Sequence, residues 1–175
     1  MSSKRYAIWY EPTQIIYDEL KKIISDLSKQ YNSSIFEPHI TLLPGGCELD
    51  KKVVVEKLKN IVRKTKPFET TFGKLNQLDE YFKSIFIEVE KTKDLINFAN
   101  NIQKEVNGVI AQNYAPHLSI LYGQIPNDEK EKTIKLLGRN YTKSFTLNKV
   151  DIIEYEFNQL PETWKKIASI ELQYE

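Results

Sequence analysis

The sequence predicts an α+β fold with two lobes, in which antiparallel sheets line a central groove and helices lie outside. Three observations support this fold class. Short apolar segments typical of strands alternate with amphipathic helical segments along the 175 residues. The two histidines of the chain, His39 and His117, lie in tracts that match each other. The order of elements around the first histidine recurs around the second, which indicates a pseudo-twofold repeat within one bilobal domain, residues 1–175.

The first half of the chain predicts strand, helix, strand, helix and strand. Residues 5–10 are apolar and aromatic and end at Glu11-Pro12, which favours a strand. Thr13 can cap a helix to about residue 30, because the apolar residues from Ile15 to Leu27 keep helical spacing. The same criteria predict a strand around His39 closed by residues 44–46, a helix from 49 or 50 to 64, a strand over 68–78 interrupted or bulged at Gly73, and a turn at 79–80.

The second half repeats this order and adds one strand. We predict a strand over 84–89, a helix over 93–107, a polar link to residue 113, the His117 strand, a helix from 126 to 137 that Gly138 stops, a strand over 144–154, a link over 158–163 and a strand over 164–172. The histidines are 78 residues apart, and the same shift superimposes the other elements of the two halves. We therefore expect repeat units of about residues 5–78 and 84–156, followed by the last strand.

Both histidine tracts read Pro-His-apolar-hydroxyl-apolar-Leu. In an extended strand, residues i and i+2 point to the same face. His39 and Thr41 therefore share one face, and His117 and Ser119 share another. A lone histidine is most often a core or surface imidazole, but the duplicated pattern favours a site. If the two faces meet, the groove holds two imidazoles that exchange protons near neutral pH and two hydroxyls that donate to an anion.

Such a groove suits in-line attack at phosphorus. One unprotonated histidine would take a proton from the attacking water or ribose hydroxyl, and the protonated one would give a proton to the leaving oxygen. Thr41 and Ser119 would donate to the non-bridging oxygens, and the scheme needs no metal or nucleotide cofactor. A Ser-His-Asp hydrolase fits less well, since each hydroxyl points parallel to its own histidine and no G-x-S-x-G elbow occurs. Cys47, in a glycine-rich turn, is a weak nucleophile candidate.

Composition narrows the partners and the compartment. Lys and Arg total 25 against 24 Asp and Glu, so the net charge of +1 favours a small phosphate ester or an RNA end over a long polyanion. The single cysteine excludes an intrachain disulfide, and two histidines with one cysteine cannot form a zinc-type cluster. No apolar run has the length of a signal peptide core or a membrane span. We expect a soluble, cytoplasmic monomer.

The paired H-x-T and H-x-S motifs resemble those of the 2H phosphoesterase superfamily. Within it, the tracts that are similar to the cyclic phosphodiesterases of plants and yeasts are Tyr6 to Pro12, Phe36 to Thr41, Pro116 to Tyr122 and Thr163 to Ser169. The resemblance implies hydrolysis of nucleoside 2',3'-cyclic phosphates to 2'-phosphates, and of ADP-ribose 1'',2''-cyclic phosphate, a product of tRNA splicing, to the 1''-phosphate. The plant members carry several cysteines that this chain lacks, so redox regulation is not implied.

The same resemblance implies a role for each site residue. His39 and His117 would be the catalytic pair, with His117 as base and His39 as acid in the scheme proposed for the family, and Thr41 and Ser119 would bind phosphate. Tyr122 would line the site and Trp9 would flank it. In a regular strand, however, Tyr122 faces away from Ser119, so this role requires a bend or bulge before Gly123. Otherwise it is a core residue, and Trp9 is either core or a platform for a base.

Two alternatives stay open from the sequence. One is another branch of the superfamily, an RNA-end 2',3'-cyclic phosphodiesterase or ligase or an RNA-trimming exonuclease, for which a more basic groove rim is expected. The other is a nucleotide-binding or RNA-end-binding module without catalysis, which the intact histidines and hydroxyls disfavour.

Overall fold

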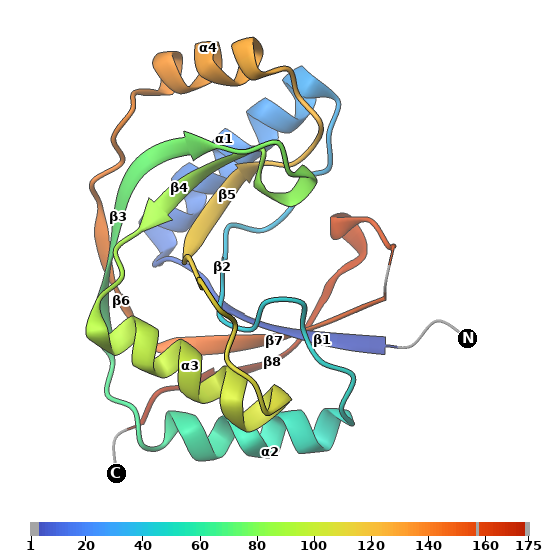
Figure 1. Ribbon diagram of the computed structural model, residues 1–175, viewed down its shortest axis with the longest axis vertical. Helices are drawn as coiled ribbons and strands as arrows, with labels where there is room; N and C mark the ends of the chain where they lie inside the picture. The colour runs from blue at the N-terminus through green and yellow to red at the C-terminus, as the bar shows by residue number, and fades with distance from the viewer. Residues whose placement is uncertain (1–3, 157, 174–175) are drawn as a thin grey trace.

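The computed structural model describes residues 4–156 and 158–173 and shows one curled, eight-stranded antiparallel sheet with four α-helices outside it (Figure 1). The elements in chain order are β1 Lys4–Tyr10, α1 Gln14–Tyr31, β2 Ile40–Thr41, α2 Lys51–Val62, β3 Phe68–Gln77, η1 Tyr81–Lys83, β4 Ile85–Val89, α3 Lys93–Asn107, β5 His117–Leu121, α4 Asn127–Leu137, β6 Ser144–Leu147, β7 Lys149–Glu156, η2 Pro161–Thr163 and β8 Lys165–Glu171. Here η1 and η2 are short 3-10 helices. The predicted α+β fold class is confirmed.

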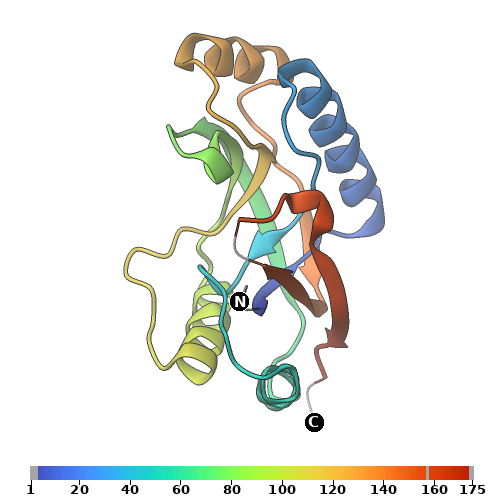
Figure 2. The ribbon, with the colours of Figure 1, turned by 90° about the vertical axis from the view of Figure 1, so that its right-hand side faces the viewer.

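The strand order is β6-β3-β4-β5-β2-β1-β7-β8, so the two predicted sheets are the two halves of one sheet. The short strand β2 joins the halves, because it pairs with β1 on one side and with β5 on the other. Helices α1 and α4 lie at one end of the molecule and α2 and α3 at the other (Figures 1 and 2).

The two predicted repeat units exchange strands in this sheet. Strand β3, the last of the first unit, pairs with β4, the first of the second unit. Strand β7, near the end of the second unit, pairs with β1 of the first. One continuous apolar core therefore contains side chains from both units. Division of the chain into two repeats within one bilobal domain stays a prediction.

The strand around His39 is shorter than predicted. Only Ile40–Thr41 pairs with β1, where Ile40 lies opposite Tyr10, and His39 precedes the strand. Continuing that register would place Pro38 opposite Pro12. Proline has no backbone N–H to give to a ladder, so the pairing ends.

Two further predictions need correction. The strand predicted over 144–154 is two strands divided at Asn148, since β6 pairs with β3 in one half of the sheet and β7 with β1 in the other. The turn predicted at 79–80 continues into the 3-10 helix η1, which the sequence did not indicate. The irregularity predicted at Gly73 is confirmed by a register shift between Phe72 and Leu75.

The helices bury the faces that their spacing predicts, with one exception. Ile15 of α1 is 83% exposed, because it lies on the far side of the helix from the buried stripe. Buried apolar residues are Ile16, Leu20, Ile24 and Leu27 of α1, Val54, Leu58, Ile61 and Val62 of α2, and Leu95, Phe98, Ala99, Ile102 and Val106 of α3. Among the described residues, no helix has both the length and the apolar character needed to cross a bilayer.

Candidate active site

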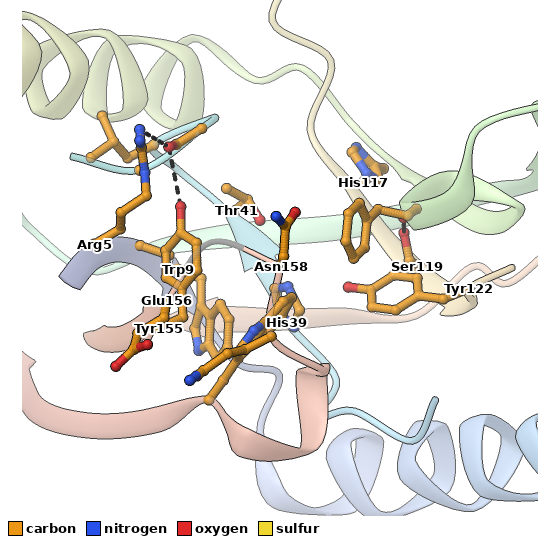
Figure 3. A pocket seen from close by; sticks show the side chains of 17 residues that line it. Arg5, Trp9, His39, Thr41, His117, Ser119, Tyr122, Tyr155, Glu156 and Asn158 are labelled. Carbon is orange, nitrogen blue, oxygen red and sulfur yellow. Dashed lines mark hydrogen bonds between the residues drawn. The ribbon is translucent and has the colours of Figure 1, made fainter. Parts of the chain in front are cut away.

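A cavity of about 520 Å³ lies between the two halves of the sheet and is lined by all six residues that the sequence nominates (Figure 3). These residues are Trp9 of β1, His39 and Thr41 at β2, His117 and Ser119 of β5, and Tyr122 just after β5. The structure therefore brings the two histidine tracts to one place, although they are distant in the sequence.

Each histidine ring is held by a backbone carbonyl two residues before it. His39 Nδ1 lies 2.7 Å from the Glu37 carbonyl oxygen, and His117 Nδ1 lies 2.8 Å from that of Ala115. Because a carbonyl oxygen only accepts, Nδ1 carries the hydrogen in both rings. In the neutral form of each ring, Nε2 then holds a lone pair on the opposite side of the ring. The proline before each histidine fixes the backbone between the ring and its carbonyl, which explains its presence in both tracts.

Burial keeps both imidazoles neutral in the free protein. It lowers the pKa of His39 to about 4, although the Glu37 carbonyl opposes this shift. Burial also lowers the pKa of His117, with a smaller contribution from the positive charge of Lys83. At neutral pH both rings are therefore ready to accept a proton. For one of them to act as an acid, a bound anion must first raise its pKa.

Trp9 supports His39. The two rings stack with their centroids 3.9 Å apart and their planes 22° apart. Trp9 is only 4% exposed and lies opposite Thr41 in the β1–β2 pair. The sequence left two roles open for Trp9, a core residue or a platform for a base. In the structure, Trp9 is a buried platform on which the ring of His39 stacks.

A bulge in β5 turns Tyr122 into the cavity. Phe86 of β4 lies opposite Ser119, while the preceding Ile85 lies opposite Leu121, so β5 carries one extra residue at this point. An extra residue reverses the alternation of faces, which brings Tyr122 to the same side as Ser119. Its ring stacks on Phe36 with centroids 3.6 Å apart. Burial raises the pKa of Tyr122, so the hydroxyl stays protonated and can donate.

The hydroxyl of Ser119 already has a partner. It donates to the backbone carbonyl of Phe82 in η1 at 2.8 Å. To donate to a bound phosphate, Ser119 must rotate away from this carbonyl. Thr41 also lines the cavity, and its own backbone carbonyl accepts a hydrogen bond from the Tyr114 hydroxyl at 2.7 Å, which ties β2 to the segment that precedes His117.

Sequence reasoning missed eleven further lining residues, among them Arg5, Phe82, Tyr155, Asn158 and Trp164. Arg5 could have been found, because it lies four residues before Trp9 and therefore shares its face of β1. The other four named residues lie at a strand end or in links whose conformation the sequence did not indicate. Across residues 4–156 and 158–173, no three His, Cys, Asp or Glu side chains are grouped so as to hold a metal ion.

Comparison with known proteins agrees with this geometry. Residues 13–159 match the family model described as the 2'-5' RNA ligase superfamily. A cyclic phosphodiesterase of Arabidopsis thaliana is 22% identical over 93% of this chain and 92% of its own length. A phosphoesterase homologue of Bacillus anthracis is 31% identical over 77% of this chain and 76% of its own.

Solved structures show the same fold. E. coli LigT complexed with phosphate has a TM-score of 0.63 at 13% identity, with 99% of both chains covered. The family match covers most of the chain, and the structural match extends from end to end. The chain belongs to the 2'-5' RNA ligase superfamily, which confirms the resemblance of its paired histidine motifs to those of the 2H phosphoesterases.

Proposed function

We propose that this protein hydrolyses cyclic phosphate diesters by acid–base catalysis with His39 and His117, without a metal. The substrates of this proposal are nucleoside 2',3'-cyclic phosphates, converted to 2'-phosphates, and ADP-ribose 1'',2''-cyclic phosphate, converted to the 1''-phosphate. One observation carries the proposal. Two imidazoles in the same cavity are each fixed through Nδ1, which leaves Nε2 of each to exchange a proton.

The two histidines together carry out both proton transfers of the reaction. Nε2 of one ring takes a proton from water while the water oxygen forms a bond to phosphorus. The bond from phosphorus to O3' of the nucleoside breaks, and Nε2–H of the other ring protonates this leaving oxygen. The two rings end with their protonation states exchanged, and solvent restores them. The geometry accommodates either histidine as the base, and the family scheme with His117 as base is the one we adopt.

Three hydroxyls would stabilise the charge that develops on the non-bridging oxygens. Tyr122, Thr41 and Ser119 all line the cavity beside the histidines. Tyr122 keeps its proton because burial raises its pKa, so it is a donor over the whole neutral range. Ser119 would exchange its bond to the Phe82 carbonyl for one to phosphate.

The relatives support this class of substrate. The Arabidopsis thaliana relative is named a cyclic phosphodiesterase, and E. coli LigT has been crystallised with phosphate and with 3'-AMP. The family also carries the name of an RNA ligase, which keeps processing of RNA ends as the second candidate function. The net charge of +1 favours the small substrate over a long polyanion.

The test is hydrolysis of adenosine 2',3'-cyclic phosphate in EDTA, with the product isomer identified by phosphorus NMR. We expect turnover that EDTA does not change and a 2'-phosphate product. A requirement for added divalent ion would contradict the metal-free scheme. A 3'-phosphate product, or activity on oligonucleotide ends alone, would favour RNA-end processing. Tight binding of 2'-AMP without turnover would indicate a binding module.

A further inference from the structure

Two aromatic rings, one from each half of the sheet, lie close to each other in the lining of the cavity. Phe82 lies in η1, between β3 and β4, and Trp164 follows η2, between β7 and β8. Their ring centroids are 6.3 Å apart and their planes are 37° apart. Each half of the sheet thus has a 3-10 turn that places one aromatic side chain at the cavity.

The core does not require the ring of Phe82. This side chain is 54% exposed, and its nearest aromatic neighbours, Tyr81 and Tyr122, meet it edge-on. The ring therefore does not stack in parallel on either tyrosine, and more than half of its side-chain surface is open to solvent. Water contact with so much apolar ring surface is unfavourable, and a flat ligand that covered it would recover that free energy.

The distance between the two ring centroids is slightly less than a third ring between them would require. A ring placed between two others needs a contact distance of about 3.5 Å on each side, or about 7 Å in total. The observed 6.3 Å therefore requires the two side chains to part by less than about 1 Å and to become more parallel. The centroid of Trp164 is 6.4 Å from that of His39, so a ligand ring between Phe82 and Trp164 would lie near His39.

A polar group is available at the same place. Asn158, in the link between β7 and η2, points its amide into the cavity (Figure 3). Its φ of 69° lies in the left-handed region, which asparagine tolerates better than most residues. A side-chain amide offers both donors and an acceptor, as the edge of a nucleobase does.

We propose that Phe82 and Trp164 form a two-sided clamp for the base of a nucleotide substrate, and that the Asn158 amide hydrogen-bonds the edge of the clamped base. The proposal rests on the function proposed above, since the cyclic phosphate at the histidines places the base. A clamp of this kind would favour cyclic nucleotides over cyclic phosphates that lack a base. The cavity volume of about 520 Å³ provides space for both the phosphate and the base.

The test compares a substrate with a base and one without. We would measure kcat/KM for adenosine 2',3'-cyclic phosphate and for methyl riboside 2',3'-cyclic phosphate with wild type, Phe82→Leu and Phe82→Tyr. Leucine keeps the apolar volume and removes the aromatic ring, whereas tyrosine keeps the ring. Phe82→Leu should lower kcat/KM for the nucleotide about tenfold, as loss of one base–aromatic stack would. It should leave the base-free substrate unchanged, and Phe82→Tyr should behave as wild type.

Equal effects of Phe82→Leu on both substrates, or none on either, would overturn the clamp. A matched control is Leu160→Ala, which removes a 61% exposed apolar side chain near η2 that is not among the residues lining the cavity.

Binding of 2'-AMP gives a readout that does not depend on turnover. Trp9 and Trp164 are the two tryptophans of the chain, so quenching of their fluorescence reports a base at Trp164. Quenching by 2'-AMP but not by ribose phosphate, weakened about tenfold by Phe82→Leu, supports the clamp even if hydrolysis fails. Equal quenching by both contradicts it.

Asn158 is tested by base preference. Asn158→Gly removes the amide, and glycine accepts the positive φ without strain. We expect the ratio of kcat/KM for adenosine and cytidine cyclic phosphates to change about fivefold, the effect of one hydrogen bond, whereas Phe82→Leu should lower both alike. An unchanged ratio would exclude Asn158 from base recognition.

Discussion

The burial of His39 couples the free energy of unfolding to pH, and the size of this coupling follows from the structure. Burial lowers the pKa of His39 to about 4 in the folded protein, against 6.5 for an unperturbed imidazole. Between these values the unfolded state binds more protons than the folded state, so stability falls as the pH falls. The stability linked to neutral His39 is complete above about pH 6.5 and is lost as the pH drops toward about 4.

The expected magnitude is about 2 kcal/mol between about pH 7.5 and about pH 5.0, since one pKa unit corresponds to about 1.36 kcal/mol. The assay is urea denaturation at both pH values for wild type and His39→Asn. The asparagine amide can keep the donation that His39 Nδ1 makes to the Glu37 carbonyl, but it does not titrate. Wild type should lose about 2 kcal/mol more than the variant on acidification. His117 and the carboxylates are common to both proteins, so their contributions cancel.

If wild type and His39→Asn lose the same free energy of unfolding within about 0.5 kcal/mol, the reasoning fails. His39 would then be accessible to solvent or paired with an anion in the folded state. In either case the buried, neutral imidazole described here would be wrong, and with it the requirement that substrate binding protonate one histidine.

The remaining predictions concern single groups around the cavity. Tyr122→Phe and Ser119→Ala each remove one donor among several, so each should lower kcat/KM about tenfold in steady-state assays, and no loss in either would exclude that hydroxyl from phosphate binding. Gly46→Ala should destabilise the fold by about 1–3 kcal/mol in urea denaturation, because its Cβ would lie 2.6 Å from Tyr155 Oη and 2.9 Å from a backbone oxygen. Gly45→Ala has a similar positive φ but nothing within 4 Å of the new Cβ, so it should cost less. If both variants lost the same free energy of unfolding, the positive φ alone would explain the loss, and the close approach to Tyr155 would not contribute.

Local patterns were enough to predict the helices and the pairing of the two histidine tracts. The period-two spacing placed His39 with Thr41 and His117 with Ser119, and the structure brings all four to one cavity. The proline before each histidine was visible in the sequence, but its relation to the carbonyl that holds the ring required coordinates.

Features that depend on distant partners could not be predicted. The bulge that turns Tyr122 inward arises from the register between β4 and β5, which the sequence of β5 does not contain. The division at Asn148 exists because β6 and β7 pair with strands in different halves of the sheet. Phe82 lay in a segment with only a turn signal, and its position close to Trp164 depends on the curl of the whole sheet.

The central claim is that His39 and His117 act as one acid–base unit. We would measure kcat on adenosine 2',3'-cyclic phosphate for His39→Asn, His117→Asn and the double variant, with 2'-AMP binding as the control for an intact cavity. Each single variant should lose about 10²- to 10⁴-fold in kcat, and the double variant should lose little more, because removing either member disables the pair. Either single variant retaining a tenth of wild-type kcat, or losses that multiply in the double variant, would contradict the account.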